Sequence, residues 1–180
     1  MLLALQLVST LCAGFFAGAA LYITVVEHPV RAGLGTQAAA TQWGPSYKRA
    51  TLMQAPLALA SFLSGTAASL MGAGLAWFVA AILIGSVVPI TLIVIRPTNH
   101  KLLEPGRDLS TGETRSLLEQ WGKLHSIRTA FSVIAFVLFA WSLLWPSKPI
   151  ERTSARCALW RRTSARWASQ SMLPKREVLS

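Results

Sequence analysis

The distribution of polar residues constrains this chain more than any other feature. Long apolar stretches cover Leu2–Val26, Leu52–Gly72, Leu75–Ile95 and Ile127–Trp145. Almost every charged residue or histidine before residue 147 lies in one of two segments, after the first stretch or after the third. If all four stretches cross a membrane, these two segments lie on the same side. The pattern therefore predicts an apolar bundle with one polar face, which holds whatever chemistry the protein performs.

The length of the stretches favours membrane-spanning helices. About 20 apolar residues, at about 1.5 Å per residue, cover a hydrocarbon core of about 30 Å. Only 13% of the residues are charged, whereas soluble domains carry about 25%. Lipid offers no partner to an unpaired backbone group, so helices are expected. We predict an all-α, multi-pass integral membrane protein, a four-helix transmembrane bundle with polar connectors on one membrane side.

The two ends of the chain need separate interpretation. The first stretch lacks a basic residue near its start and exceeds the apolar run of about 7–15 residues in a signal peptide, which favours a retained span. Residues 147–180 carry eight of the 17 Lys and Arg residues. We therefore predict a transmembrane domain over 1–146 and a basic tail over 147–180. Its Arg- and Ser-rich composition favours disorder over an interfacial helix.

Glycine and proline predict where the helices end and how they pack. Gly14 and Gly18 let a neighbouring helix approach closely, with packing inside the bundle favoured over dimerisation. Gly72 and Gly74 predict a tight turn between the second and third helices. The first helix is expected to stop at Pro29, and a connector is expected over residues 30–51. The third helix should kink at Pro89 and end at 96–99. A helix capped by Ser110 should run from about Thr111 into the fourth span.

Polar residues from every helix are expected to meet at one end of the bundle. Residues three and four apart share a helical face, so Trp121, His125 and Arg128 project together. The candidates on the other helices are His28, Asn99, Arg49, Tyr47 and Trp43. Each has an ordinary role as well, because boundary arginines reach headgroups and tryptophans anchor at interfaces. Convergence of the whole set favours a functional pocket.

Metal chemistry has little support in the sequence. His28, His100 and His125, with Glu27, could supply ligands. The chain lacks the Glu-x-x-His pattern of helical di-iron sites, so no metal site is predicted. A haem held by His28 and His125 stays an alternative without specific support from the spacing. The basic balance indicates membrane topology and lipid contact, not nucleic acid.

The order of the motifs resembles a known family. Gly-x-x-x-Gly at Gly14–Gly18 is followed by Glu27-His28-Pro29, then Trp-x-Pro-x-Tyr-x-Arg at Trp43–Arg49. Pro97-Thr98-Asn99 and Trp-x-x-x-His-x-x-Arg at Trp121–Arg128 complete the series. The series is similar to the DUF1772 family of small membrane proteins, which includes the anthrone oxygenases of polyketide pathways. The resemblance covers about residues 10–145, and the basic tail departs from it.

The resemblance implies oxidation of an anthrone to an anthraquinone by molecular oxygen, with no flavin, haem or metal cofactor. Its substrate is an aromatic polyketide or another apolar small molecule. On this hypothesis His125 or His28 is the general base. Arg128, Arg49 or Asn99 holds the developing oxyanion. Trp43, Tyr47 and Trp121 stack on the polycycle.

Two other classes of function stay open at this point. The same polar pocket suits a non-catalytic membrane protein that binds a lipid or apolar metabolite or scaffolds partners. The third hypothesis is a haem- or quinone-linked electron carrier. The sequence leaves the substrate, the membrane and the orientation open.

Overall fold

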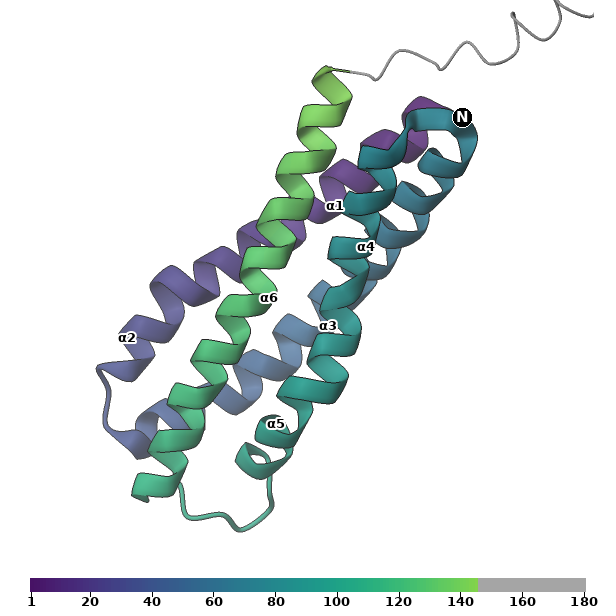
Figure 1. The fold of residues 1–180 in the computed structure, drawn as a ribbon. Helices are drawn as coiled ribbons and strands as arrows, with labels where there is room; N and C mark the ends of the chain where they lie inside the picture. Colours follow the sequence, from purple (N-terminus) through teal and green to yellow (C-terminus); the bar gives the residue numbers. More distant parts are fainter. Residues whose placement is uncertain (146–180) are drawn as a thin grey trace, which may run out of the picture. The chain divides into compact units, whose positions relative to one another are not determined.

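The computed structural model describes residues 1–145, which form four long helical units (Figure 1). Each unit is long and apolar enough to cross a membrane, which confirms the prediction of an all-α, multi-pass membrane protein. The predicted basic tail lies outside the described residues. The units comprise α1 (Leu2–Tyr22), η1 (Ile23–Glu27) and α2 (His28–Ala32); α3 (Thr36–Ala68) and η2 (Ser69–Ala73); α4 (Leu75–Pro89), η3 (Ile90–Ile95) and α5 (Arg96–Leu102); and α6 (Gly112–Leu144).

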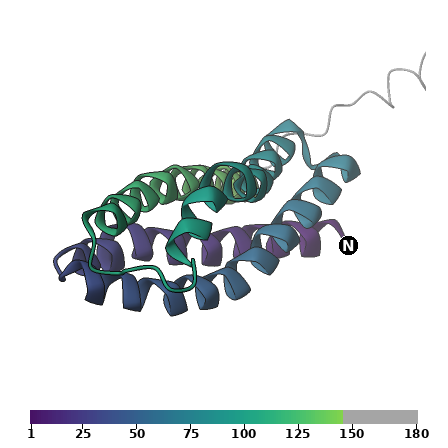
Figure 2. The same ribbon diagram turned by 90° about the horizontal axis from the view of Figure 1, so that it is seen from below.

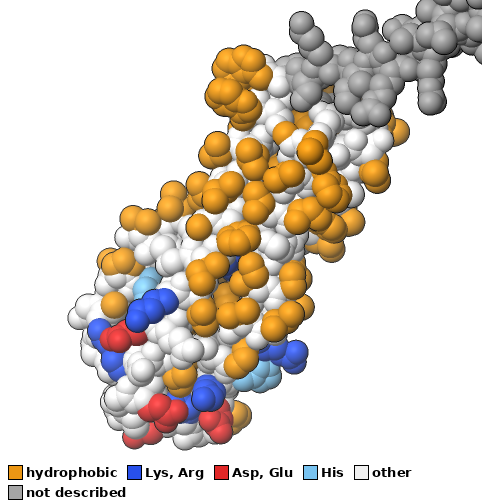
Figure 3. All heavy atoms as spheres, viewed as in Figure 1, with side chains coloured by type: hydrophobic (Ala, Val, Ile, Leu, Met, Phe, Trp, Pro, Cys, Tyr) orange, Lys and Arg blue, Asp and Glu red, His pale blue; other side chains and the backbone are white. Residues whose placement is uncertain are grey.

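The helices form a four-sided bundle. α1 packs against α3 and α6, and α4 packs against the same two helices (Figure 2). The N-terminus and the last turn of α6 lie at one end, and α2, α5 and the loop before α6 lie at the other (Figure 1). The charged side chains visible in Figure 3 gather at that second end, whereas apolar side chains cover the flank. The prediction of polar connectors on one side of the bundle is confirmed.

The helices reach further than the sequence suggested. The first helical unit does not stop at Pro29. A π-helical turn, η1, precedes this proline, and its wider bonding pattern accommodates a residue that cannot donate the usual i→i−4 bond. The third unit likewise passes Pro97 and ends at Leu102, with η3 before the proline.

The predicted connector over residues 30–51 is mostly helix. Only residues 33–35 join α2 to α3, which begins at Thr36 with an alanine run of high helix propensity. Pro45 and Pro56 lie inside α3. The two helical connectors thus extend the bundle beyond its apolar part and build the walls of its polar end.

The residue that caps the start of α6 differs from the predicted one. Thr111, not Ser110, caps α6, and its Oγ1 accepts a hydrogen bond of 3.2 Å from the backbone N–H of Thr114. Ser110 instead donates its hydroxyl and its backbone N–H to Asp108, which holds the pKa of that carboxyl below its usual value. The predicted helix from about Thr111 into the fourth span is confirmed.

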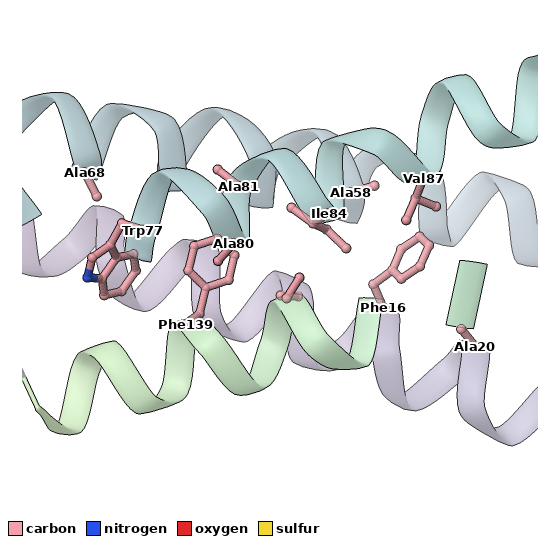
Figure 4. Close-up of a cluster of buried hydrophobic side chains, with 12 residues drawn as sticks. Phe16, Ala20, Ala58, Ala68, Trp77, Ala80, Ala81, Ile84, Val87 and Phe139 are labelled. Atoms are coloured by element: carbon pink, nitrogen blue, oxygen red, sulfur yellow. The ribbon is translucent and has the colours of Figure 1, made fainter. Parts of the chain in front are cut away.

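The larger of two buried apolar clusters fills the half of the bundle away from the charged end. Phe16, Trp77, Ile84 and Phe139 are at most 1% exposed and meet between the helices, with small alanines around them (Figure 4). Gly65 permits this packing, because a Cβ atom there would lie 2.7 Å from Cζ of Phe139.

The remaining glycine predictions have different outcomes. A Cβ at Gly14 would lie 2.9 Å from the ring of Phe136, so the first glycine of the Gly-x-x-x-Gly motif serves packing within the bundle. Gly18 has no side-chain neighbour within 4 Å of such a Cβ. Gly72 and Gly74 adopt φ angles of 93° and 107°, which only glycine tolerates well. They confirm the tight turn that pairs α3 with α4.

Candidate functional site

A small space, the central cavity, lies at the polar end and is lined by residues of all four helical units. Its volume is about 20 Å³, which is room for about one water molecule. Several of the predicted site residues line it: Trp43, Tyr47, Asn99, Trp121, His125 and Arg128. The structure therefore brings these side chains together from α3, α5 and α6.

Aromatic rings form one wall of the central cavity. Trp43 and Tyr47, one turn apart on α3, stack with ring centroids 5.1 Å apart and planes at 8°. Trp121 meets Trp43 edge-on at 5.7 Å. Trp43 is 1% exposed and Trp121 5%. These buried rings are too deep to act as interface anchors, and they give the cavity a flat apolar surface.

His125 is buried on α6, and its two ring nitrogens differ in their surroundings. Nδ1 lies 3.1 Å from Oγ1 of Thr24 and 3.4 Å from Oγ1 of Thr129. Nε2 has no hydrogen-bond partner. Thr24 has a single hydroxyl proton, and two other oxygens lie within reach of it, the carbonyl oxygen of Ala20 at 3.0 Å and Oγ1 of Thr129 at 2.8 Å. When Thr24 donates to either of these, it accepts from Nδ1–H of His125, and the lone pair of the ring is then on Nε2.

Arg128 is buried one turn further along α6 without a carboxylate. A terminal nitrogen donates to Oε1 of Gln54, and the guanidinium lies 5.2 Å from the ring centroid of Phe16. Its Nε has no partner, nor has Nε2 of Gln54. Within residues 1–145 no acidic side chain forms an ion pair with Arg128. A buried cation of this kind is suited to a negatively charged or strongly polarised oxygen.

Asn99 lies on α5 beside the aromatic wall. Its Nδ2 donates to the hydroxyl of Tyr47 at 3.0 Å, and its Oδ1 has no partner. With 3% of its surface exposed, Asn99 does more than end a helix. The free carbonyl oxygen offers the cavity a hydrogen-bond acceptor.

A polar network that the sequence analysis missed closes the outer side of the cavity. Arg31 is 3% exposed and donates to Glu27 and Gln42. Ser46 donates to the same carboxylate at 2.6 Å. The guanidinium of Arg31 also lies 5.9 Å from the ring centroid of Trp121. The spacing of Glu27 and Arg31, four residues apart, was the available signal for this pair.

Two predicted candidates do not reach the central cavity. Arg49 has an exposed side chain and is not among its lining residues. His28 lines a separate space of about 10 Å³ with Arg31 and Glu119. Its ring packs so tightly on the backbone of Gly122 that a Cβ there would lie 2.1 Å from its Nε2.

The described residues also contain no cluster of three or more His, Cys, Asp or Glu side chains that could hold a metal ion. The three histidines are therefore not gathered into one ligand set within residues 1–145.

Comparison with known proteins agrees with the motif series. A family model described as anthrone oxygenase matches residues 43–138, a range that includes all the predicted residues of the central cavity. The chain is also 31% identical over 143 residues to the anthrone oxygenase tpcL of Aspergillus fumigatus, an alignment that covers 74% of this chain and 89% of that protein. No solved structure matches. The chain belongs to the anthrone oxygenase family.

Proposed function

We propose that this protein oxidises a polyketide anthrone to the corresponding anthraquinone with molecular oxygen and without a cofactor, and that Nε2 of His125 is the base. One observation carries the proposal: His125, a buried imidazole whose Nε2 has no hydrogen-bond partner, lines a cavity walled by flat aromatic rings. Membership of the family and the anthrone oxygenase relative support the substrate class.

The chemistry asks little of the protein. The methylene of an anthrone lies between two aromatic rings and opposite a ketone, so loss of one proton gives a delocalised enolate. His125 takes that proton at Nε2, and Arg128 stabilises the negative charge on the ketone oxygen. Oδ1 of Asn99 is a free hydrogen-bond acceptor, which suits a phenolic hydroxyl of the substrate because an amide oxygen accepts hydrogen bonds and cannot donate them.

The remaining steps balance with oxygen as the only oxidant. The enolate carbon gives electrons to molecular oxygen and forms a carbon–oxygen bond, and the resulting peroxide takes the proton from His125. His125 then takes the second methylene proton, the oxygen–oxygen bond breaks, and the hydroxide that leaves takes this proton from His125. The products are the new carbonyl group of the anthraquinone and one water molecule.

The test is oxidation of emodin anthrone by membranes that contain the full-length chain. The substrate is added without oxygen, air is admitted, and the initial rate of emodin formation is measured by absorbance. Membranes without the protein give the autoxidation rate. Because a positioned base contributes about 10²–10⁴-fold, His125→Gln should remove most of the acceleration.

His100→Gln is the matched control. His100 is an exposed imidazole at the same end of the bundle, it accepts a hydrogen bond of 3.1 Å from Arg96, and it does not line the central cavity. This variant should keep the wild-type rate. An unchanged rate in His125→Gln with a loss in His28→Gln would move the base to His28. No acceleration by the wild-type chain would refute the oxygenase and leave a binding protein.

A further inference from the structure

A second space opens sideways from the bundle, between α3 and the third helical unit. This lateral groove has a volume of about 120 Å³, which is several times that of the central cavity. Buried residues form its floor, and exposed residues of the apolar flank form its rim. The floor includes Phe16, Gln54, Val87 and Arg128, and the rim includes Ala55, Val88 and Leu92.

The floor of the lateral groove carries two unsatisfied donors. Gln54 is 1% exposed and Arg128 9%. Nε2 of Gln54 and Nε of Arg128 both lack a partner. A buried N–H without an acceptor is costly, so a ligand oxygen placed here gains two hydrogen bonds that lipid tails cannot supply. The positive charge of Arg128 favours an oxygen that is anionic or strongly polarised.

The lateral groove and the central cavity are neighbours. Thr51, Thr91 and Arg128 line both spaces. The central cavity holds about one water molecule, whereas binding sites for small organic molecules measure about 300–1,000 Å³. A tricyclic molecule can reach His125 only if the bundle opens. The boundary at Thr51 and Thr91 is one place where a larger space adjoins the central cavity, and it is the one that opens on the apolar flank.

The helices beside this boundary have weakened backbone bonding. Pro56 lies inside α3 on one side of the groove, and Pro89 directly precedes η3 on the other. Prolines and π-helical turns are the places where helices bend. Small movements of either wall would therefore widen the groove without breaking a regular helix.

We propose that the lateral groove binds a flat apolar molecule through one acceptor oxygen, which lies between Gln54 and Arg128, and that the molecule enters it from the bilayer. The rim is apolar and faces the lipid, the floor supplies the donors, and the groove leads toward His125. That the molecule is an anthrone or a similar polycycle rests on the proposed function.

The first test fills the groove without touching the floor. Full-length protein in liposomes is titrated with tritiated emodin, and saturable retention above protein-free liposomes gives the Kd. Val88→Trp places a large ring at the rim and should weaken binding about tenfold. Ile82→Trp is the matched control, because it lies on the same helix, is 47% exposed where Val88 is 40% exposed, and does not line the groove. It should bind as the wild type does.

The second test examines the acceptor oxygen. Gln54→Glu keeps the size and the contact with Arg128 but replaces the free donor with a carboxylate oxygen. Emodin binding should fall about tenfold, and retention of anthracene, which has no oxygen, should not change. Equal emodin binding by wild type, Val88→Trp and Gln54→Glu would overturn the proposal, as would the absence of saturable emodin retention.

The two proposals fail in different ways. If emodin retention depends on Val88 and Gln54 but the chain does not oxidise emodin anthrone, the groove is supported and the oxygenase is refuted. Oxidation of emodin anthrone at the wild-type rate by Val88→Trp supports the oxygenase and refutes the groove as its route of access.

Discussion

Replacement of Thr24 by valine tests how the bundle prepares His125 as a base. Valine has the shape of threonine without the hydroxyl. The change removes the 3.1 Å contact to Nδ1 of His125 and leaves that nitrogen with Thr129 at 3.4 Å. An unsatisfied buried N–H costs about 1–3 kcal/mol, and a tenfold change corresponds to about 1.4 kcal/mol. The equilibrium constant that favours the tautomer with a free Nε2 should therefore fall about 5- to 150-fold.

The assay follows kcat and KM for oxidation of emodin anthrone in membranes. Thr24 does not line the central cavity, so the loss should fall on kcat and leave KM nearly unchanged. Thr24→Ser keeps the hydroxyl and should recover the rate. Nitrogen NMR of protein labelled at histidine should show the proton move from Nδ1 toward Nε2 in the valine variant only. A kcat for Thr24→Val within about twofold of wild type would refute the role assigned to the hydroxyl. Such a change is below about 0.5 kcal/mol, which is the size expected of a substitution that removes no important contact.

Three further predictions concern packing and charge. Gly65→Ala should destabilise the bundle by about 1–3 kcal/mol and lower its Tm in detergent. Gly18→Ala should keep or raise the Tm, because nothing lies within 4 Å of the added methyl group. Equal Tm values for the two variants would contradict the close approach of Phe139 to Gly65. Glu27→Gln removes the carboxylate partner of buried Arg31 and should cost about 3–5 kcal/mol, which a steric-trapping measurement of unfolding would detect or exclude. Arg49→Ala should leave anthrone oxidation within about twofold of wild type, since the side chain is exposed; a large loss of rate would return it to the site.

Much of the architecture was accessible from the sequence. The apolar stretches predicted the four spans, because burial of backbone groups in lipid leaves few alternatives to helices. Gly72 and Gly74 marked the turn between α3 and α4 through a φ that other residues avoid. The helix ends were harder. Pro29 and Pro97 predicted helix ends, yet both lie in a helical turn that follows a π-helical segment. A π-helical segment has no characteristic amino-acid composition, so the sequence did not indicate it.

The candidate site was only partly accessible. Spacing on α6 placed Trp121, His125 and Arg128 on one face, and the structure puts all three at the central cavity. Arg49 lies two residues after Tyr47 on α3, about 200° around the helix, so spacing within that helix already turns it away from the site. His28 lines a separate space, and this outcome depends on how the first helical unit packs. Gln54 and Thr24 escaped notice because single polar residues inside apolar spans give no periodic signal. Their importance comes from partners on other helices, Arg128 and His125.

The two π-helical turns, η1 and η3, have a consequence for how this bundle can vary. A π turn holds one residue more than the α turn it replaces, and one residue corresponds to a rotation of about 100° around the helix axis. Each segment therefore sets the rotational phase of everything that follows it, including Arg31 after η1 and Asn99 after η3. The apolar half keeps its own phase. Insertion or deletion of one residue at either segment would turn the residues that follow it and leave the cluster around Phe16, Ile84 and Phe139 packed as before. Only the second apolar cluster, which includes Ile95 and Leu102, would have to repack, so side chains at the polar end can change while the apolar half stays the same.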